Sequence, residues 1–209
     1  GHGLSGGTPL DSIEAMADWI IALHDSLEVN AACLVGHSQG CLVTIDAAAR
    51  YPDRVARVGL IAGALAIPVN DHLLSLYDKA LSKAIQAMIS WGHGPMGHMH
   101  DNTQPGHSFL GFGNQLMAAN NQNALKNDLI ACNKYKNGED SASKIQQPAL
   151  CILAEKDKMT PLKFGQQMAN TLIRGQVTVI ESAGHMLPAE FPNEVNTALR
   201  NFLNETDKS

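Results

Sequence analysis

No cluster of lysines and arginines occurs in this sequence, and charged residues of either sign are scarce. Asp, Glu, Lys and Arg together make up 17% of the 209 residues, and the formal net charge is −5. A nucleic-acid-binding surface needs concentrated positive charge, so this class of function is excluded. Apolar residues account for 44% of the chain, which is typical of a globular protein. The length suits one domain with a sizeable core and room for an insertion.

Long apolar runs and paired cysteines are missing as well. The longest apolar run, residues 58–69, is too short to cross a bilayer and is broken by Pro68, so no membrane span is predicted. All four cysteines lie in or beside apolar stretches, and none belongs to a C-x-x-C pair. They are Cys33, Cys41, Cys132 and Cys151. Free thiols that serve as small core residues are typical of a reducing compartment, so we predict a cytoplasmic protein.

The most informative stretch is residues 36–40, which read G-H-S-Q-G and fit the pattern G-x-S-x-G. Residues 31–35 before it predict a buried strand, and residues 41–50 after it predict a helix. A strand that turns into a helix this abruptly forces Ser38 into a strained backbone conformation, and glycines on both sides avoid collisions with neighbouring backbone. Such a turn exposes the serine hydroxyl and aims the backbone N–H of Gln39 at the atom attacked. Alone, the pattern also fits an ordinary tight turn.

Strands and helices alternate at both ends of the chain but not in the middle. A helix over residues 10–29 and a strand over 55–62 flank the G-x-S-x-G segment. From residue 66 to residue 143 only helical patterns follow. They cover residues 71–91, 109–120 and 123–135, with a loop over 92–106. We therefore predict a core formed by residues 1–65 and 144–209, with residues 66–143 inserted as an all-helical cap or lid.

The alternation resumes with predicted strands over residues 149–154 and 176–180. Thr160-Pro161 predicts a helix start, with the threonine as N-cap and the proline at the first helical position. A last helix is predicted from Pro192. Asp157 and His185 follow the two strands directly, as Ser38 follows the strand before it. In an open parallel sheet this carboxyl edge is where sites form, so the three side chains are candidates for one site.

Four segments resemble, in order, the motifs of the α/β-hydrolase family. Residues 1–5 (GHGLS) are similar to its P-G-H-G-x-S loop, and residues 36–40 to its nucleophile elbow. Residues 154–161 resemble the segment that carries the acid, and 183–188 the segment that carries the histidine. The resemblance implies an α/β fold with a mostly parallel sheet and an inserted helical cap, and a chain order of nucleophile, acid and histidine.

The residue types give this arrangement its expected chemistry. A serine hydroxyl is a weak nucleophile until a base takes its proton, and His185 is the candidate base. Asp157 would orient the imidazole, and the Gln39 N–H would stabilise the oxyanion. We expect a serine hydrolase that cleaves a small or medium acyl ester through an acyl-serine, without cofactor or metal. A carbon–carbon bond hydrolase, an aminopeptidase-like amidase, and a ligand-binding module with slow or no turnover remain open.

Competing interpretations exist for several residues. Glu155 is the rival for the acid role, and Asp157 could simply cap the next helix. His37, beside the serine, is expected to pack below the turn. Clustered histidines can also bind zinc, and one loop carries several of them together with an aspartate. These residues are His93, His98, His100, Asp101 and His107. Their spacing fits no helix-borne zinc motif, and the glycine-rich loop favours a flexible gate.

The sequence departs from the resemblance at one point. The family has further strands before the G-H-G-x-S loop, and a loop among them supplies half of the oxyanion hole. Without a neighbour, the strand over residues 31–35 would expose an open hydrophobic edge. We therefore expect an N-terminal segment or a second chain to complete the sheet.

Overall fold

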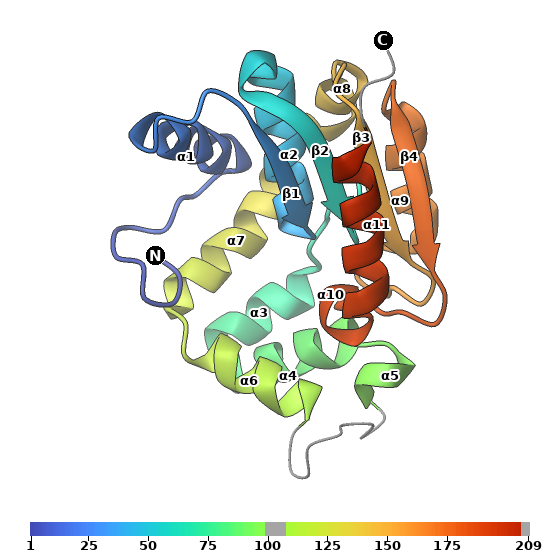
Figure 1. Cartoon of the computed structure of the whole chain (residues 1–209). Helices are drawn as coiled ribbons and strands as arrows, with labels where there is room; N and C mark the ends of the chain where they lie inside the picture. The colour runs from blue at the N-terminus through green and yellow to red at the C-terminus, as the bar shows by residue number, and fades with distance from the viewer. Residues whose placement is uncertain (99–107, 206–209) are drawn as a thin grey trace.

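The computed structural model describes residues 1–98 and 108–205, and its centre is a parallel sheet of four strands (Figure 1). The order in the sheet is β1 (Ala32–His37), β2 (Val55–Ile61), β3 (Ala149–Ala154) and β4 (Gly175–Ile180). All three pairings are parallel. The α/β class and the parallel sheet predicted from the sequence are confirmed.

Strand β3 shows how the sheet is buried, since all six of its residues are buried. Its residues alternate between two cores, as the two-residue period of a strand requires. Cys151 and its alternate neighbours face a core shared with α2 (Gln39–Arg50), α8 (Gly138–Ser143) and α9 (Leu162–Thr171). Ile152 and its neighbours face a second core shared with α10 (Leu187–Glu190) and α11 (Pro192–Asn204). Helices therefore cover both faces of the sheet.

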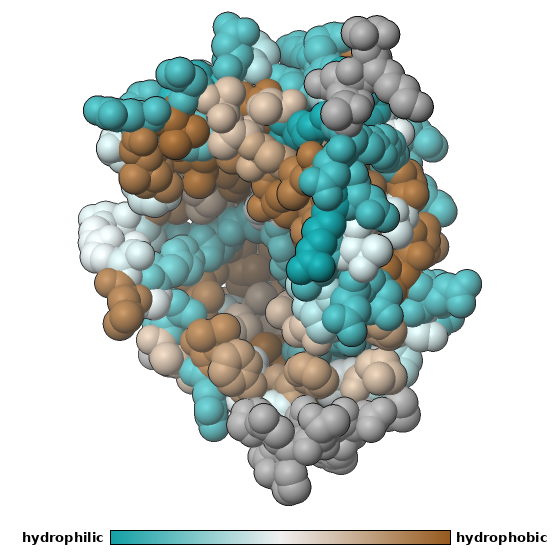
Figure 2. Space-filling view, viewed as in Figure 1, coloured by the Kyte–Doolittle hydropathy of each residue, from teal (hydrophilic) through white to brown (hydrophobic). Residues whose placement is uncertain are grey.

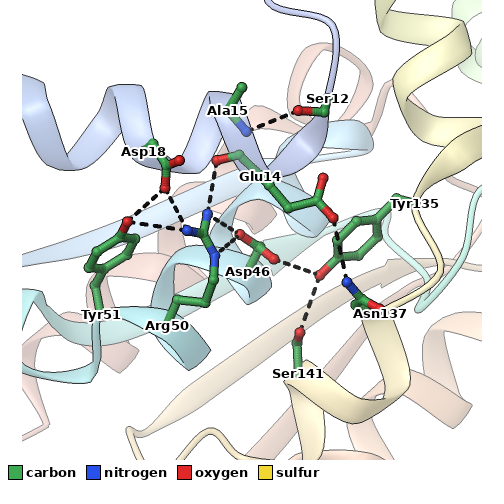
Figure 3. Close-up of polar contacts among 10 residues, drawn as sticks. All are labelled: Ser12, Glu14, Ala15, Asp18, Asp46, Arg50, Tyr51, Tyr135, Asn137 and Ser141. Atoms are coloured by element: carbon green, nitrogen blue, oxygen red, sulfur yellow. Dashed lines mark hydrogen bonds and ion pairs between the residues drawn. The ribbon is translucent and has the colours of Figure 1, made fainter.

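Helix α1 (Ile13–Ser26) packs against α2, and a short 3-10 helix, η1 (Pro52–Arg54), leads into β2. A polar cluster fastens this region (Figure 3). The buried carboxylate of Asp46 accepts a hydrogen bond from Arg50 at 2.6 Å and one from the hydroxyl of Tyr135 at 3.1 Å. Arg50 also donates to Asp18 on α1 at 2.6 Å. The cluster thus ties α1 and α2 to the residue that follows α7 (Gln122–Lys134), Tyr135.

The helical insertion (residues 66–143) enters between β2 and β3. It holds α3 (Asp71–Lys79), α4 (Leu81–Gly92), α5 (Pro95–His98), α6 (Phe109–Ala118), α7 (Gln122–Lys134) and α8. Figure 1 shows α3 to α6 lying beyond the carboxyl ends of the strands. Leu73 and Tyr77 from α3 and Ala84 from α4 form a small core of their own. The insertion therefore covers the edge of the sheet where the candidate site was predicted.

Three local predictions differ from the structure. The single helix expected over 71–91 is two helices, because Ala80 leaves helical geometry with φ −157° and ψ 64°. The expected loop after residue 92 contains the short helix α5. Helix α8 was not predicted, and its Ala142 belongs to the core shared with α2 and α9. The boundary of the cap at residue 143 stays a prediction.

Strand β1 is the outer strand beside α1, and among the described residues its pairing partner is β2. Val35 in this strand is 44% exposed. Beside it lies a groove of about 510 Å³ with apolar walls that include Met16, Trp19 and Val43. Figure 2 shows the molecule hollowed here, between α1 above and the helical insertion below. The open hydrophobic edge expected for this strand is present in the structure.

The four cysteines are free, and Cys41, Cys132 and Cys151 are buried as expected. Within residues 1–98 and 108–205, no helix combines the length and the apolar character needed to cross a membrane.

Candidate active site

Ser38 sits at the turn between β1 and α2 in the predicted strained conformation, with φ 55° and ψ −119°. Its N–H donates to the carbonyl of Ile61 at 2.9 Å, which fixes the turn to the end of β2. A Cβ atom at Gly36 would lie 2.1 Å from the carbonyl oxygen of Gly40, so only glycine fits there. A Cβ atom at Gly40 would meet nothing within 4 Å outside its own helix. The collision expected at Gly40 is therefore wrong, and the constraint lies on Gly36.

Gln39 is the first residue of α2, and the first N–H groups of a helix have no acceptor within the helix. The positive end of the helix dipole lies at the same place, so the Gln39 N–H is suited to stabilise a negative oxygen. The Gln39 side chain has a contact that the sequence did not predict. Its Nε2 donates to the carbonyl of Asp128 on α7 at 2.9 Å, which links the turn to the helical insertion.

Asp157 and His185 form a buried pair, with Asp157 Oδ2 2.9 Å from His185 Nδ1. The other carboxylate oxygen, Oδ1, accepts the N–H groups of Met159 and Thr160 at 2.8 Å each. Asp157 therefore organises the following turn and holds the histidine at the same time. Burial opposes ionisation, but the hydrogen bond and charge of His185 and the bonds from Thr160 outweigh it. They hold the pKa of Asp157 below its usual value.

Thr160 is a member of this site that the sequence did not reveal. It was predicted as an N-cap, but α9 begins at Leu162 with Pro161 as its N-cap residue, so that prediction is wrong. The Thr160 hydroxyl lies 2.8 Å from Asp157 Oδ2, 2.8 Å from the Ala62 carbonyl oxygen and 3.2 Å from His185 Nδ1. Its position three residues after Asp157 was the available signal.

His37 does more than pack below the turn. Its Nε2–H donates to the backbone carbonyl of His185 at 2.8 Å, and the centroids of the two rings are 4.9 Å apart. Burial, followed by the charge of His185, lowers the pKa of His37 to about 4. A neutral His37 therefore connects the elbow to the loop that carries His185.

The three predicted residues lie at the carboxyl ends of β1, β3 and β4. The described residues include no hydrogen bond from the Ser38 hydroxyl, and in unliganded sites this bond is often long. Ser38 and Thr160 line a cavity of about 340 Å³. Its walls come largely from α3, α4 and α7. Glu155, the rival acid, is exposed and accepts the N–H of Ser182 at 2.9 Å instead of contacting His185.

The histidines considered for zinc have other contacts where the structure describes them. His93 is buried and bonded to the carbonyl of Ile89 at 2.8 Å, and His98 contacts the carbonyl of Ser90 at 3.0 Å. His100, Asp101 and His107 lie outside the described residues. Within the described part of the chain, no group of three or more His, Cys, Asp or Glu could hold a metal ion.

The sequence matches the profile of the alpha/beta hydrolase family over residues 1–198. Protein ABHD8 of Mus musculus is 24% identical over an alignment that covers 97% of this chain and 47% of that protein. Carboxylesterase YbfK of Bacillus subtilis (strain 168) is 27% identical, over 90% of this chain and 62% of that protein. The chain spans about half to three fifths of these curated relatives.

The crystal structure of the enol-lactonase from Burkholderia xenovorans LB400 has the same fold. It superposes with a TM-score of 0.85 at 22% identity and covers 98% of this chain and 78% of that one. The profile match over nearly the whole sequence and the shared fold lead to one conclusion: the chain belongs to the alpha/beta hydrolase family.

Proposed function

We propose that this hydrolase cleaves a small or medium acyl ester through an acyl-serine intermediate. The observation that supports this most directly is the buried Asp157–His185 pair at the same sheet edge as a serine with φ 55°. Strain at a non-glycine residue persists only where the surrounding structure imposes it, and such residues concentrate at functional sites. A turn with no chemical role would have no need of a buried acid–imidazole pair beside it.

In the proposed reaction, the Ser38 oxygen attacks the ester carbonyl while His185 takes the hydroxyl proton. Asp157 keeps Nδ1 of the imidazole protonated, which leaves Nε2 free to act as base, and stabilises the imidazolium that forms. The Gln39 N–H stabilises the oxyanion. His185 then gives its proton to the leaving alcohol, and a water molecule activated by the same imidazole releases the acid. No step needs a cofactor or a metal.

The size and lining of the cavity support an acyl substrate of modest length. The cavity of about 340 Å³ is lined by Ser38 and by apolar side chains of the helical insertion, among them Leu73, Met88, Leu125 and Leu129. The larger groove beside β1 is not lined by Ser38, so we do not assign the substrate to it. The name of the Bacillus subtilis relative, a carboxylesterase, favours an ester over an amide or a carbon–carbon bond.

A fluorophosphonate probe and p-nitrophenyl esters of graded chain length test this proposal. The folded protein should be labelled at Ser38 and should hydrolyse short and medium esters, and Ser38→Ala should abolish both. Labelling that survives in Ser38→Ala would overturn the assignment of the nucleophile. A folded wild type that takes no label would favour the ligand-binding alternative. Labelling without ester hydrolysis would direct the search to amides and carbon–carbon bonds.

Replacing the other two residues tests whether they act with the serine. Because members of a triad work as one unit, the Ser38→Ala, His185→Ala double variant should be about as inactive as either single variant. Losses that multiply would contradict this. Glu155→Gln should keep most of the activity, since Glu155 is exposed, and a collapse there would move the acid role to Glu155.

We propose that the helical insertion acts as a cap that selects the substrate. Its helices supply much of the cavity wall, while Ser38, Asp157 and His185 all come from outside it. Substitutions at Leu125 and Leu129 should therefore change the preference among acyl lengths more than the rate of Ser38 labelling. Equal effects on both would contradict the cap.

We also propose that an extended strand, from further chain or from a second chain, pairs with the open edge of β1. The exposed Val35 and the apolar groove beside it support this. A loop attached to such a strand would add a second oxyanion donor, and loss of one donor typically costs about 100- to 1000-fold in rate. Adding the strand should raise kcat accordingly. An unchanged kcat would contradict the proposal.

The cytoplasmic location stays a prediction.

A further inference from the structure

Glu190 is a buried carboxylate that the proposed reaction does not use. It is the last residue of α10, five residues after His185, and it is 8% exposed. Its Oε2 accepts the N–H groups of Gly94 at 2.9 Å and Gly97 at 3.4 Å, both in the helical insertion. Burying a carboxylate is costly, so its retention in such a place needs a reason.

The segment that Glu190 holds, residues 92–97, lies directly against the backbone on both sides of His185. The N–H of Met186 donates to the carbonyl of Gly92 at 2.8 Å. A Cβ atom at Gly184 would lie 2.1 Å from the nitrogen of Gly94, and a Cβ atom at Gly94 would lie 2.5 Å from the nitrogen of Gly184. The two glycine backbones are therefore in direct contact, and the position of one sets that of the other.

The imidazole of His185 is oriented by Asp157 and Thr160, but its main chain needs separate support. His37 holds the carbonyl of His185. Residues 92–97 support the neighbours on either side, and Glu190 fixes that segment to the end of α10. The backbones of Gly94 and Gly184 lie so close together that no residue larger than glycine fits at either position.

From this arrangement we infer that Glu190 is a positioning residue, which holds His185 in place through residues 92–97. The inference rests on the proposed function. Oε2 of Glu190 performs this task as the acceptor for the backbone N–H groups of Gly94 and Gly97. The second oxygen, Oε1, is buried and has no hydrogen-bond partner among the described residues. An amide at this position would keep one acceptor oxygen, so Gln should perform the task that Ala cannot.

The test compares Glu190→Ala, Glu190→Asp and Glu190→Gln with the wild type, with kcat expressed per serine titrated by a fluorophosphonate. A base displaced by about 1 Å can cost on the order of 100-fold in rate. For Glu190→Ala we expect kcat to fall by roughly 10- to 100-fold, with KM within about twofold. The kcat of Glu190→Asp should lie between those of the wild type and Glu190→Ala. The kcat of Glu190→Gln should stay within about threefold of the wild type. Glu194→Ala, an exposed glutamate on α11, is the matched control and should be unchanged.

A purely structural role would lower the amount of titratable enzyme without changing kcat per site. Glu190→Ala with kcat within twofold of the wild type therefore overturns the inference, and so does Glu190→Gln as impaired as Glu190→Ala. If Glu190→Ala does not fold, the other two variants are compared with the wild type. A lowered kcat in Glu190→Asp with Glu190→Gln within about threefold supports the inference, and an unchanged Glu190→Asp or a strongly impaired Glu190→Gln overturns it. Failure of the proposed function is distinguishable, because it is seen without any change at Glu190: either the wild type lacks labelling or ester hydrolysis, or Ser38→Ala retains them.

Discussion

Thr160 contacts Asp157 and His185 together, so its hydroxyl belongs to the network that sets the orientation of the imidazole. Valine has nearly the same shape as threonine but cannot form hydrogen bonds. We predict that Thr160→Val lowers kcat about tenfold, the effect of one lost hydrogen bond to a charged group. Steady-state ester hydrolysis measures this directly.

Two further variants control this prediction. Thr160→Ser keeps the hydroxyl and should retain most of the activity. Thr171→Val removes an exposed hydroxyl that donates to the Gln167 carbonyl at 3.0 Å, far along α9, and should have no effect. A Thr160→Val enzyme as fast as the wild type would show that Asp157 holds the imidazole without help.

His37 makes stability depend on pH. Its pKa is about 4 in the folded protein, below the ordinary value of 6.5. Between these values the unfolded chain binds more protons, so the free energy of unfolding falls as the pH falls from 6.5 to 4. The shift corresponds to at most about 3 kcal/mol. We predict that His37→Gln, which keeps an N–H donor and cannot titrate, removes much of this slope.

Urea unfolding at a series of pH values from 7 to 4 measures this effect. His72→Gln, a change at an exposed histidine on α3, should leave the slope as it is. Burial raises the pKa of Glu190, so this group contributes a slope of the opposite sign. Its contribution lowers the free energy of unfolding as the pH rises. Equal slopes for the wild type and His37→Gln would refute the assignment to His37.

At the scale of elements, the polar cluster in Figure 3 joins α1 and α2 to the end of the helical insertion. The side chain of Asp46 is 2% exposed and bonds both Arg50 and Tyr135. Its removal takes one hydrogen-bond acceptor from the Arg50 guanidinium and one from the buried hydroxyl of Tyr135. We predict that Asp46→Ala lowers the free energy of unfolding by about 2–3 kcal/mol, measured by urea denaturation.

The helix α8 offers a matched comparison. Asp140 pairs with Lys144 one turn later, as Asp46 pairs with Arg50, but both side chains are more than half exposed. Because exposed pairs contribute little, Asp140→Ala should have almost no effect. Equal losses in the two variants would mean that burial is not what gives the Asp46 pair its strength.

The sequence predicted the elements that carry strong local signals. Ser38, Asp157 and His185 were predicted as site residues because motifs mark the ends of strands, and the buried strands were predicted from their apolar runs. The break at Ala80 was missed because alanine favours helix and the apolar pattern continues through it, so tertiary packing decides there. Thr160, Glu190 and the His37–His185 contact join residues that are distant in the chain or have another local interpretation, and periodicity carries no signal for such contacts.

At the scale of the whole molecule, the open edge of β1 should determine how the 209-residue chain behaves in solution. An exposed apolar strand edge is a site for self-association. We predict that the chain alone forms dimers or larger species in sedimentation velocity at tens of micromolar, and that Val35→Lys shifts it toward monomer. Val177→Lys, on the outer strand at the opposite side of the sheet, is the control. A wild-type monomer at these concentrations would contradict the prediction.

The separation of β2 from β3 affects how the chain folds during synthesis. Residues 62–148 lie between the two strands, although the strands pair side by side. At typical rates of translation the ribosome needs roughly 5–15 s to make this stretch. During that time β2 can pair with β1, but Val58 and Leu60 lack β3, the strand on their other side that shares their core. The nascent chain should therefore depend on chaperones that hold unfolded segments, and its yield should rise when they are abundant.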